Sequence, residues 1–568
     1  MNFRTFQADH TDRAEEGTGG LFIPERSATE RLIALGIFVA ACLYLSMFRR
    51  YTSIDPDEGI VLQGTQRILR GEVLYRDFFS FLTPGSFYLL ALIFKIFGDS
   101  MLVARTALAV YGGIFSVFTY WVARRTCSRS IALMTAYVVI VACLPWRFMT
   151  LHNWDSTVWA CLAVYCAIVL IQSPHWGWAL GLGTFVSFTL LSDQSKGAGL
   201  FCGLFLGFAV AGWIGHPVAW LDRSCRIATG AGLVWPVLAT LGYFGAHHAL
   251  GSLFADWAWA PFHYSSVNRV PYGFMDWSDQ ERTIMFASGP WAERLAAFLA
   301  VSPCFLIPAL PIVGFGLLPY WILAARRGLM NINRAIFYIV MSSAVGGLLA
   351  SVIVVRAGIV HFVYLAPVFY LVLAWILDGK DLPSSIVRGA RPVLIAGVLI
   401  AFSLVGAAFL VVNRNAHSIA ATRRGDVALA APETVISYTQ AHVRAGSSML
   451  VYPYLPLYYY LTSTHSPTRY EYFQPGMHTR EQSEEAINEI EVDRTATVLL
   501  EPSFYEKVAT SWPNTPLRFL ANDPIGDYIR RNYHSCAILV SGAESRFFFM
   551  VRNGSNCPDE GVKAELRR

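Results

Sequence analysis

The apolar stretch RLIALGIFVAACLYLSMF (Arg31–Phe48), followed shortly by the acidic segment DPDEG (Asp55–Gly59), decides the fold of this chain. A helix needs about 20 mostly apolar residues to cross the hydrocarbon core of a bilayer, and the first stretch is close to that length. The second stretch places three carboxylates just beyond the expected membrane exit. Charged groups at a membrane edge are costly and usually face a cavity or a partner. The two stretches together predict a membrane helix that leads into a polar site at the membrane surface.

The composition extends this prediction to the whole chain. Of its 568 residues, 55% are hydrophobic, 14% are aromatic and only 15% are charged, and the mean hydropathy is +0.44. Soluble domains usually carry about 25% charged residues. The net charge of +5 is mild and is spread over loops without a basic tract or a nucleic-acid motif. We therefore expect a polytopic membrane protein and no nucleic-acid partner.

Apolar runs of membrane-spanning length recur along the first 412 residues. Phe87–Phe97 is too short to span and predicts a re-entrant or interfacial helix. About eleven runs predict transmembrane helices: Arg31–Phe48, Met101–Val122, Ile131–Leu144, Trp154–Ile171, Gly177–Leu191, Gly197–Ile214, Ile227–Leu250, Phe298–Ala324, Ala335–Val355, Val360–Leu377 and Pro392–Val412.

The distribution of Lys and Arg predicts the orientation. One set of alternate short loops is rich in basic residues, with Arg124, Arg125 and Arg129 in the first of them, and the opposite set is poor in them. Basic loops stay in the cytoplasm, although Arg49 and Arg50 argue the other way at the first span. We expect a multi-pass protein of the plasma (inner) membrane with a cytoplasmic N-terminus, an uncleaved first span and a periplasmic or extracellular C-terminal domain.

The chain divides into three predicted parts. Residues 1–30 form a cytoplasmic tail, and residues 31–412 form the membrane domain, whose first outer loop covers residues 49–100. Residues 413–568 regain a normal charge content, and β-rich runs alternate there with helical stretches, which predicts a soluble α/β domain outside the membrane. Cys536 and Cys557 could form a disulfide in that compartment, but nothing in the sequence fixes their distance.

Ionisable residues gather at helix ends on the predicted outer face. Asp57, Glu58, Asp155, Lys196 and His361 all follow or open a predicted span there. Each of them alone is explained as well by a helix cap or an interfacial charge. Together they predict one outward-facing site. A carboxylate there could take a proton from an acceptor hydroxyl, while cations stabilise a departing phosphate that belongs to an amphiphile.

Several motifs resemble those of the integral-membrane GT-C glycosyltransferases. They begin with the Asp57-Glu58 pair, and they continue with GEVLYRDF (Gly71–Phe78), PGSFY (Pro84–Tyr88), SDQSKG (Ser192–Gly197) and the sequence from Arg356 to His361-Phe362 and Pro367. The chain resembles the protein O-mannosyltransferase and aminoarabinose transferase families, and more closely the RgtA/B/C/D-like bacterial group. The resemblance is strongest between Ile54 and Arg125, and it implies a GT-C-like transmembrane domain.

The resemblance implies roles for particular residues. Asp57 would be the general base or would orient the acceptor hydroxyl, and Glu58 would support it or bind the sugar. The remaining candidates would bind substrate: Asp155, Arg76, Lys196, Arg356 and His361. The motifs imply no certain cofactor. A divalent cation near Asp57, Glu58 and Asp155 stays open, and no metal ligand is assigned.

The implied reaction moves a sugar from a polyprenyl-phosphate donor to an acceptor hydroxyl at the outer face, with inversion at the anomeric carbon. The acceptor could be a glycan, a lipid or a protein. The alternative is a transporter or flippase for a lipid-linked saccharide, which shares the polytopic body and the outer charges. Transporters often show repeated halves and polar groups near the midplane, and the sequence shows neither, which favours the enzyme.

Overall fold

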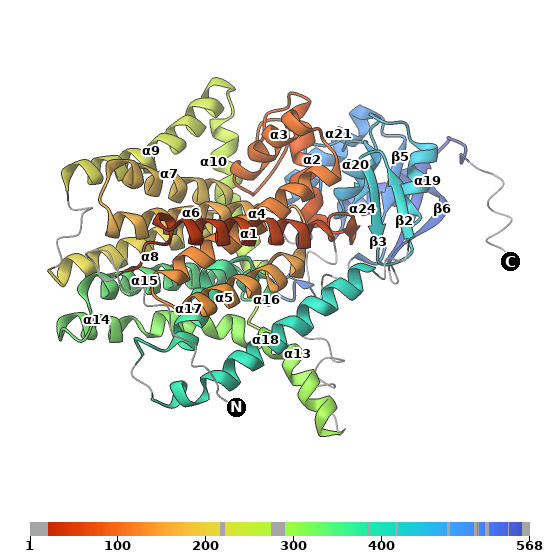
Figure 1. Cartoon of the computed structure of the whole chain (residues 1–568). Helices are drawn as coiled ribbons and strands as arrows, with labels where there is room; N and C mark the ends of the chain where they lie inside the picture. The colour runs from red at the N-terminus through yellow and green to blue at the C-terminus, as the bar shows by residue number, and fades with distance from the viewer. Residues whose placement is uncertain are drawn as a thin grey trace.

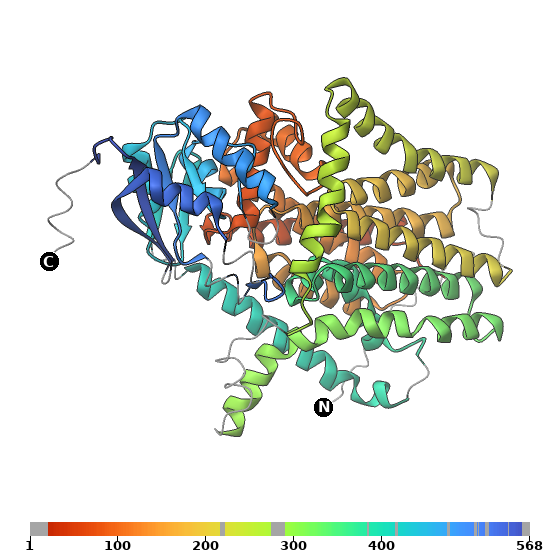
Figure 2. The ribbon, with the colours of Figure 1, turned by 180° about the vertical axis from the view of Figure 1, so that it is seen from behind.

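A bundle of long helices carries a mixed α/β region at one end (Figures 1 and 2). The computed structural model describes residues 21–215, 222–273, 290–382, 385–414, 418–473, 478–504, 508, 511–516, 522–542 and 545–558. Residues 1–20 of the predicted N-terminal tail lie outside the described residues, as do residues 274–289 of the predicted aromatic loop.

The helices of the bundle match the apolar runs of the sequence. Within the described residues, nine helical segments are long and apolar enough to cross a membrane. They comprise α1 (Ala28–Ser46), α4 (Met101–Arg124), α5 (Arg129–Ala142) running into the 3₁₀ turn η3 (Leu144–Arg147), α6 (His152–Gln172), α8 (Gln194–Trp213), α9 (Arg223–Ala246), α13 (Trp291–Gly316) running into α14 (Leu318–Arg326), α15 (Ile332–Val355) and α18 (Ser385–Arg414). Three further apolar helices are shorter, namely α3 (Gly85–Phe97), α7 (Trp176–Ser192) and α17 (Ala366–Asp378). The predicted polytopic helical fold is confirmed.

The predicted span Val360–Leu377 is divided in two. It consists of α16 (Ile359–Tyr364) and α17, which meet at Leu365. Pro367 lies in the first turn of α17, where its missing N–H leaves no hydrogen bond unmade, so the new helix starts there without penalty. The break leaves His361 on a short helix of its own.

The C-terminal region is built on a four-stranded sheet with the order β4-β5-β7-β6. Its strands are β4 (Leu450–Tyr452), β5 (Thr497–Leu500), β6 (Tyr533–Ser541) and β7 (Ser545–Arg552), of which β4 and β5 pair parallel and the others antiparallel. The helices between and before them are α19 (Val435–His442), α20 (Leu457–Thr462), α21 (Arg480–Asp493) and α24 (Pro524–Asn532). This arrangement confirms the mixed α/β region that the alternating sequence predicts.

A second, three-stranded sheet joins the first loop to the C-terminal region. In it β1 (Tyr51–Thr52) pairs parallel with β3 (Gly425–Leu429), which pairs antiparallel with β2 (Ser418–Thr422). The sequence does not predict this contact, because a two-residue strand is too short to show any periodicity.

Helix α2 (Pro56–Leu69) carries the acidic segment and lies against α20 of the α/β region. Gly59 makes the close approach possible, because a Cβ atom there would lie 2.1 Å from the backbone nitrogen of Leu457. Two backbones can approach this closely only where one residue has no side chain.

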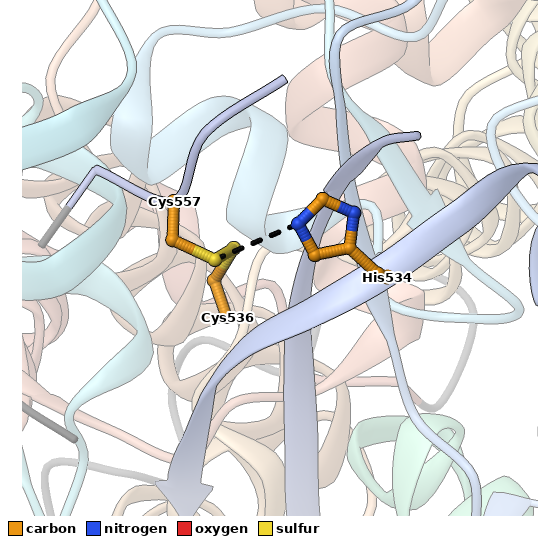
Figure 3. Close-up of side chains that lie close together, drawn as sticks. All are labelled: His534, Cys536 and Cys557. Atoms are coloured by element: carbon orange, nitrogen blue, oxygen red, sulfur yellow. Dashed lines mark hydrogen bonds between the residues drawn. A yellow bond between two sulfur atoms is a disulfide. The ribbon is translucent and has the colours of Figure 1, made fainter. Parts of the chain in front are cut away.

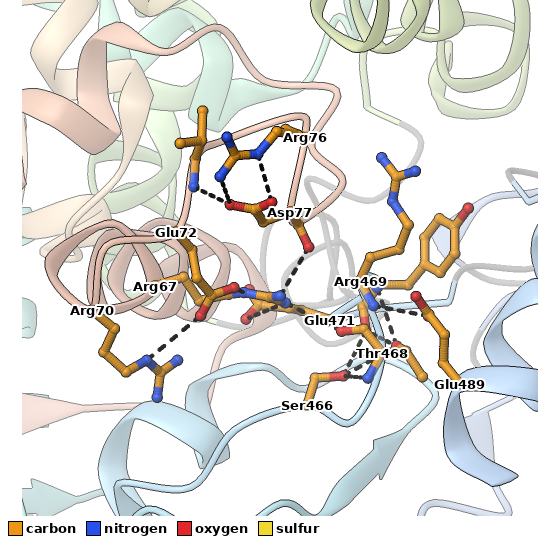
Figure 4. A network of polar contacts seen from close by, with 12 residues as sticks. Arg67, Arg70, Glu72, Arg76, Asp77, Ser466, Thr468, Arg469, Glu471 and Glu489 are labelled. Carbon is orange, nitrogen blue, oxygen red and sulfur yellow. Dashed lines mark hydrogen bonds and ion pairs between the residues drawn. The ribbon is translucent and has the colours of Figure 1, made fainter. Parts of the chain in front are cut away.

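A buried polar network holds the other end of α2 (Figure 4). The Arg67 guanidinium donates to Glu72 Oε2 at 2.6 Å and to the carbonyl oxygens of Asp77 and Thr468 at 3.1 and 3.2 Å. It also lies 3.6 Å from the Glu471 carboxylate. Burial raises the pKa of Glu471 to about 7, against the lowering effect of Arg67. Both ends of α2 are therefore fixed to the α/β region.

The Cys536–Cys557 disulfide, which the sequence left open, is formed in the structure (Figure 3). It ties the end of the described chain to the edge strand β6. The Cys557 sulfur lies 3.7 Å from Nε2 of His534. Both sulfurs are engaged in the disulfide, so this group offers no thiolate to a metal ion.

Replacing Gly59 by alanine is expected to destabilise the contact between α2 and α20. The new methyl group would overlap backbone atoms, which cannot rotate away, and overpacking of this kind costs about 1–3 kcal/mol. Thermal unfolding of the purified protein in detergent measures the effect. Gly36→Ala on α1 is the matched control, because nothing lies within 4 Å of its Cβ position. Equal unfolding midpoints for the two variants would contradict the close approach.

Candidate active site

A cavity of about 340 Å³ lies where the helical bundle meets the first loop and the α/β region. Its wall comes from the start of α2, the 3₁₀ turn η3 (Leu144–Arg147), the starts of α6 and α8, the end of α15, and α16. Polar and aromatic residues in the wall include Asp57, Thr83, Arg147, His152, Asn153, Ser192, Asp193, Lys196, Tyr264, His361, Tyr364 and Tyr454. Three of the predicted site residues, Asp57, Lys196 and His361, therefore meet in one cavity.

The first turn of α2 is fixed by a carboxylate and an arginine. Asp55 caps the helix, and its Oδ1 accepts a hydrogen bond from the Asp57 backbone N–H at 2.9 Å. Nη2 of Arg147 donates to Asp55 Oδ2 at 2.8 Å and to Asp57 Oδ2 at 2.9 Å. One guanidinium thus joins both acids to the bundle.

The Asp57 side chain is packed among protein groups but is still exposed to the cavity. Its side chain is 47% exposed. Desolvation by the surrounding protein and the charge of Asp55 raise its pKa to about 6, while Arg147 and Arg356 oppose the rise. A carboxylate with a pKa just below neutrality is ionised at pH 7 and can still accept a proton, which suits a general base.

Lys196 is held by the first turns of two helices. Asp193 caps α8, and its carboxylate lies 3.3 Å from the Lys196 ammonium. The ammonium donates to the Asn153 side-chain oxygen at 2.7 Å, and to the Asn153 carbonyl and Ser156 Oγ at 3.1 Å. Its charge is therefore compensated within the wall of the cavity. An anion in the cavity would bind Lys196 by exchanging one of these contacts.

Four polar atoms of the wall have no hydrogen-bond partner among the described residues. They are Thr83 Oγ1, Arg147 Nε, Ser192 Oγ and His361 Nδ1. Buried polar groups are usually hydrogen-bonded, and exceptions need an explanation. Hydrogen-bonding capacity that the protein leaves unused in a cavity wall is what a polar ligand requires.

Glu58 is placed away from the cavity, although it is adjacent to Asp57 in the sequence. Its carboxylate is fully buried and forms an ion pair with Arg105 of α4 at 2.5 Å. It also accepts the Thr150 backbone N–H at 2.8 Å, while Arg105 donates to Thr52 Oγ1 at 2.8 Å. Successive residues of a helix point about 100° apart, so Asp57 and Glu58 cannot share one face. Glu58 joins the first loop to the bundle.

Two predicted substrate-binding residues also lie outside the cavity wall. Asp155 is buried two residues after Asn153 of the cavity wall, and it accepts the Tyr111 hydroxyl at 2.8 Å. Arg76 pairs with the neighbouring Asp77 at 2.8 Å and donates to the His247 carbonyl at 3.2 Å. The structure does not bring either side chain into contact with Asp57.

A third predicted residue, Arg356, follows Val355 of the cavity wall but is not itself part of the wall, and it connects three segments. It caps the end of α15, and its guanidinium donates to Asn268 Oδ1 at 2.9 Å. The same guanidinium donates to the Ser511 carbonyl of the α/β region at 3.1 Å. Arg356 thus holds the α/β region over the cavity and contributes to the field at Asp57.

The residues considered for a divalent cation do not form a ligand set. Arg147 occupies the space between Asp55 and Asp57, Glu58 is paired with Arg105, and Asp155 is bonded to Tyr111. Over the part of the chain that is described, the one close group of three metal-ligating residue types is His534, Cys536 and Cys557, whose cysteines are oxidised.

Arg147 is the important residue that was not among the candidates from the sequence. It is one of the few basic residues in the predicted outer loops. That rarity was itself a signal, because a lone arginine in a loop set poor in positive charge is not explained by topology. Tyr264, Tyr364 and Tyr454 carried no such signal, since aromatic residues are common at membrane interfaces.

Comparisons with known proteins agree with the fold. Residues 82–235, just over a quarter of the chain, match the family model PMT_2, described as dolichyl-phosphate-mannose-protein mannosyltransferase. The structure of ArnT from Cupriavidus metallidurans bound to undecaprenyl phosphate is similar, with a TM-score of 0.52, 12% identity, and coverage of 94% of this chain and 100% of ArnT. The archaeal oligosaccharyltransferase AglB from Archaeoglobus fulgidus gives a TM-score of 0.43 at 12% identity, over 94% of this chain and 76% of AglB. No curated protein sequence matches the chain.

The fold is therefore that of a multi-pass helical membrane protein, and it resembles the fold of ArnT. Within that fold, residues 82–235 are similar to the PMT_2 mannosyltransferases.

Removing Arg105 is expected to unfold the first loop. Arg105→Met leaves the Glu58 carboxylate buried without its counter-ion, and breaking a buried pair in this way costs about 3–5 kcal/mol. The thermal unfolding midpoint in detergent should fall sharply. Arg76→Met removes an exposed pair instead and should change the midpoint little. A midpoint for Arg105→Met equal to that of Arg76→Met would show that the buried pair does not hold the loop.

Proposed function

We propose that this enzyme transfers a sugar from a polyprenyl-phosphate donor to an acceptor hydroxyl at the outer face of the membrane. The observation that carries the proposal is that Asp57 shares one cavity with Arg147, Lys196 and His361. A base for the acceptor and cations for a phosphate are the two requirements of this reaction.

An apolar groove beside the cavity supports a lipid-linked donor. It has a volume of about 440 Å³ and is lined by residues of α3, α6, α7 and α9. Ser192 borders both the groove and the cavity, while Leu92 and Trp235 lie in its wall and are exposed on the surface of the bundle. An isoprenoid chain in this groove would place its phosphate near Lys196. The similar ArnT structure is described as bound to undecaprenyl phosphate.

The proposed chemistry is a single displacement. The acceptor oxygen attacks the anomeric carbon while the bond from that carbon to the phosphate oxygen breaks. The acceptor proton passes to the Asp57 carboxylate, and polyprenyl phosphate leaves as the anion. Attack opposite the leaving group inverts the configuration. Lys196 and Arg147 stabilise the phosphate charge, and His361 donates to a phosphate or sugar oxygen.

Glu58, Asp155 and Arg356 act as positioning residues in this proposal. Arg356 does so by binding Asn268 and Ser511 at the end of α15. Glu58 fixes α2 through Arg105, and Asp155 fixes the start of α6 through Tyr111. Arg76 lies at the first loop surface with Asp77, where it can meet lipid headgroups.

The outer-face location rests on two features. The basic loops of the sequence are on the opposite side of the predicted topology. The Cys536–Cys557 disulfide lies in the α/β region, and disulfides persist in oxidising compartments such as the periplasm.

Replacing Asp57 is expected to abolish transfer without unfolding the protein. Asp57→Asn keeps the shape of the side chain but cannot accept the proton, and loss of a general base typically lowers the rate about 10²–10⁴-fold. Release of polyprenyl phosphate from a panel of purified polyprenyl-phosphate sugars measures the rate. Asp77→Asn, which lies outside the cavity wall, is the matched control and should retain activity. A wild-type protein that never releases polyprenyl phosphate but moves the lipid across liposomes would establish the transporter instead.

The rate should fall in acid because Asp57 must be ionised to act as a base. With a pKa raised to about 6, the acidic limb of kcat/KM lies near pH 6, and activity is lost as the pH falls through it. Arg147→Gln removes a nearby positive charge that lowers this pKa, so the limb should move to higher pH. Arg76→Gln should leave the limb in place. A limb that stays unmoved in Arg147→Gln would exclude Asp57 as the titrating group.

A further inference from the structure

A second cavity, of about 360 Å³, lies on the other side of the first turn of α2. It is enclosed by the strand β1 and the residues after it, by the end of β3, and by segments of the α/β region. Its wall includes the carboxylates of Glu433 and Glu501, the rings of Phe504 and Trp512, and the hydroxyls of Ser53 and Ser545. The proposed function does not use this cavity.

The two cavities adjoin at the proposed base. Pro56 lines the second cavity and Asp57, the next residue, lines the first. Tyr454 borders both. The first turn of α2 and Tyr454 are therefore shared by the walls of the two cavities.

The wall of the second cavity has a definite chemical preference. Among its described residues there are two carboxylates and no Lys, Arg or His. Burial raises the pKa of Glu433 to about 7, so its carboxylate is ionised mainly above neutral pH. Ionised carboxylates only accept hydrogen bonds, so there a ligand must supply O–H or N–H groups, and a phosphate would be repelled. Glu433 is held in place, because its oxygens accept the backbone N–H groups of Val435 at 2.9 Å and Ile436 at 3.0 Å. The rings of Phe504 and Trp512 offer apolar faces beside these acceptors.

The second cavity opens on the unit formed by the first loop and the α/β region. Ser53 and Ala430 at its edge are exposed, and both belong to that unit. The apolar groove opens instead on the surface of the bundle, at Leu92 and Trp235. The two openings are suited to ligands of opposite solubility.

We propose that the second cavity is the acceptor subsite and that it takes a neutral or amine-bearing carbohydrate. The proposal rests on the proposed function. Hydroxyl or ammonium groups of the acceptor donate to Glu433 and Glu501, and a sugar face lies on Trp512 or Phe504. The reacting hydroxyl passes Tyr454 to reach Asp57.

Protection of a cysteine at the cavity edge tests the proposal. Ser53→Cys in the purified protein is treated with a membrane-impermeant maleimide, with wild type as the background for the native cysteines. Maltotriose and a chitosan trimer at millimolar concentration should slow the labelling at least about threefold, whereas maltose 1-phosphate should not. No slowing by either saccharide, or equal slowing by maltose 1-phosphate, would overturn the proposal.

A charge-neutral variant identifies the group responsible. Ser53→Cys combined with Glu433→Gln keeps one acceptor oxygen at the place of Oε1, which lies 2.9 Å from the Val435 N–H and 3.3 Å from the Ile436 N–H, but removes the charge. Protection by the chitosan trimer should therefore weaken at least about threefold. Glu484→Gln on α21, exposed and far from the cavity wall, is the control and should preserve protection. Equal protection in both variants would exclude Glu433 and contradict the assignment.

Donor hydrolysis separates this proposal from the proposed function. Release of polyprenyl phosphate to water by wild-type protein, without any saccharide, reports only the donor half of the reaction. Hydrolysis without saccharide protection overturns the acceptor subsite alone. Protection without hydrolysis or transfer, from any donor of the panel, overturns the proposed function and leaves a carbohydrate-binding cavity.

Discussion

The bridge from Arg147 to Asp55 and Asp57 is the interaction on which the rest of the site depends. Arg147 belongs to the bundle, in the turn between α5 and α6, while both acids belong to the first turn of α2. The α/β region holds the same helix from its other side, where Gly59 touches Leu457. The proposed base therefore sits at the junction of the two parts of the protein, and its position and charge depend on contacts from both.

The way in which counter-ions are distributed among the acids explains why Asp57 is the one proposed to react. Burying a carboxylate without a partner is costly, so the acids at this junction are paired or capped. Glu58 is matched by Arg105, and Asp193 by Lys196, and both acids hold helices together. Asp57 shares its arginine with Asp55 and keeps nearly half of its side chain exposed to the cavity. Proton transfer there disturbs the fold least.

Patterns that repeat along the sequence predicted the elements of the fold. Contacts between distant segments leave no such pattern and could not be predicted. Apolar runs predicted the bundle, and alternating runs predicted the strands of the α/β region. The pairing of β1 with β3 joins residues more than 370 positions apart through two residues, which have no periodicity. The separation of Asp57 from Glu58 required knowing that Arg105 lies beside α2. For the same reason the motif predicted Asp57, Lys196 and His361 together but did not reveal Arg147.

The junction also suits a reaction between substrates of opposite solubility. A lipid-linked donor must reach the carboxylate from the bilayer, and a polar acceptor must reach it from water. A site inside the bundle would admit the first, and a site inside the α/β region would admit the second. Asp57 lies on a helix whose first turn borders the cavity beside the apolar groove, through Asp57, and the second cavity, through Pro56. The close contact at Gly59 holds that turn against the α/β region, so the proposed base stands where the two proposed substrate sites adjoin.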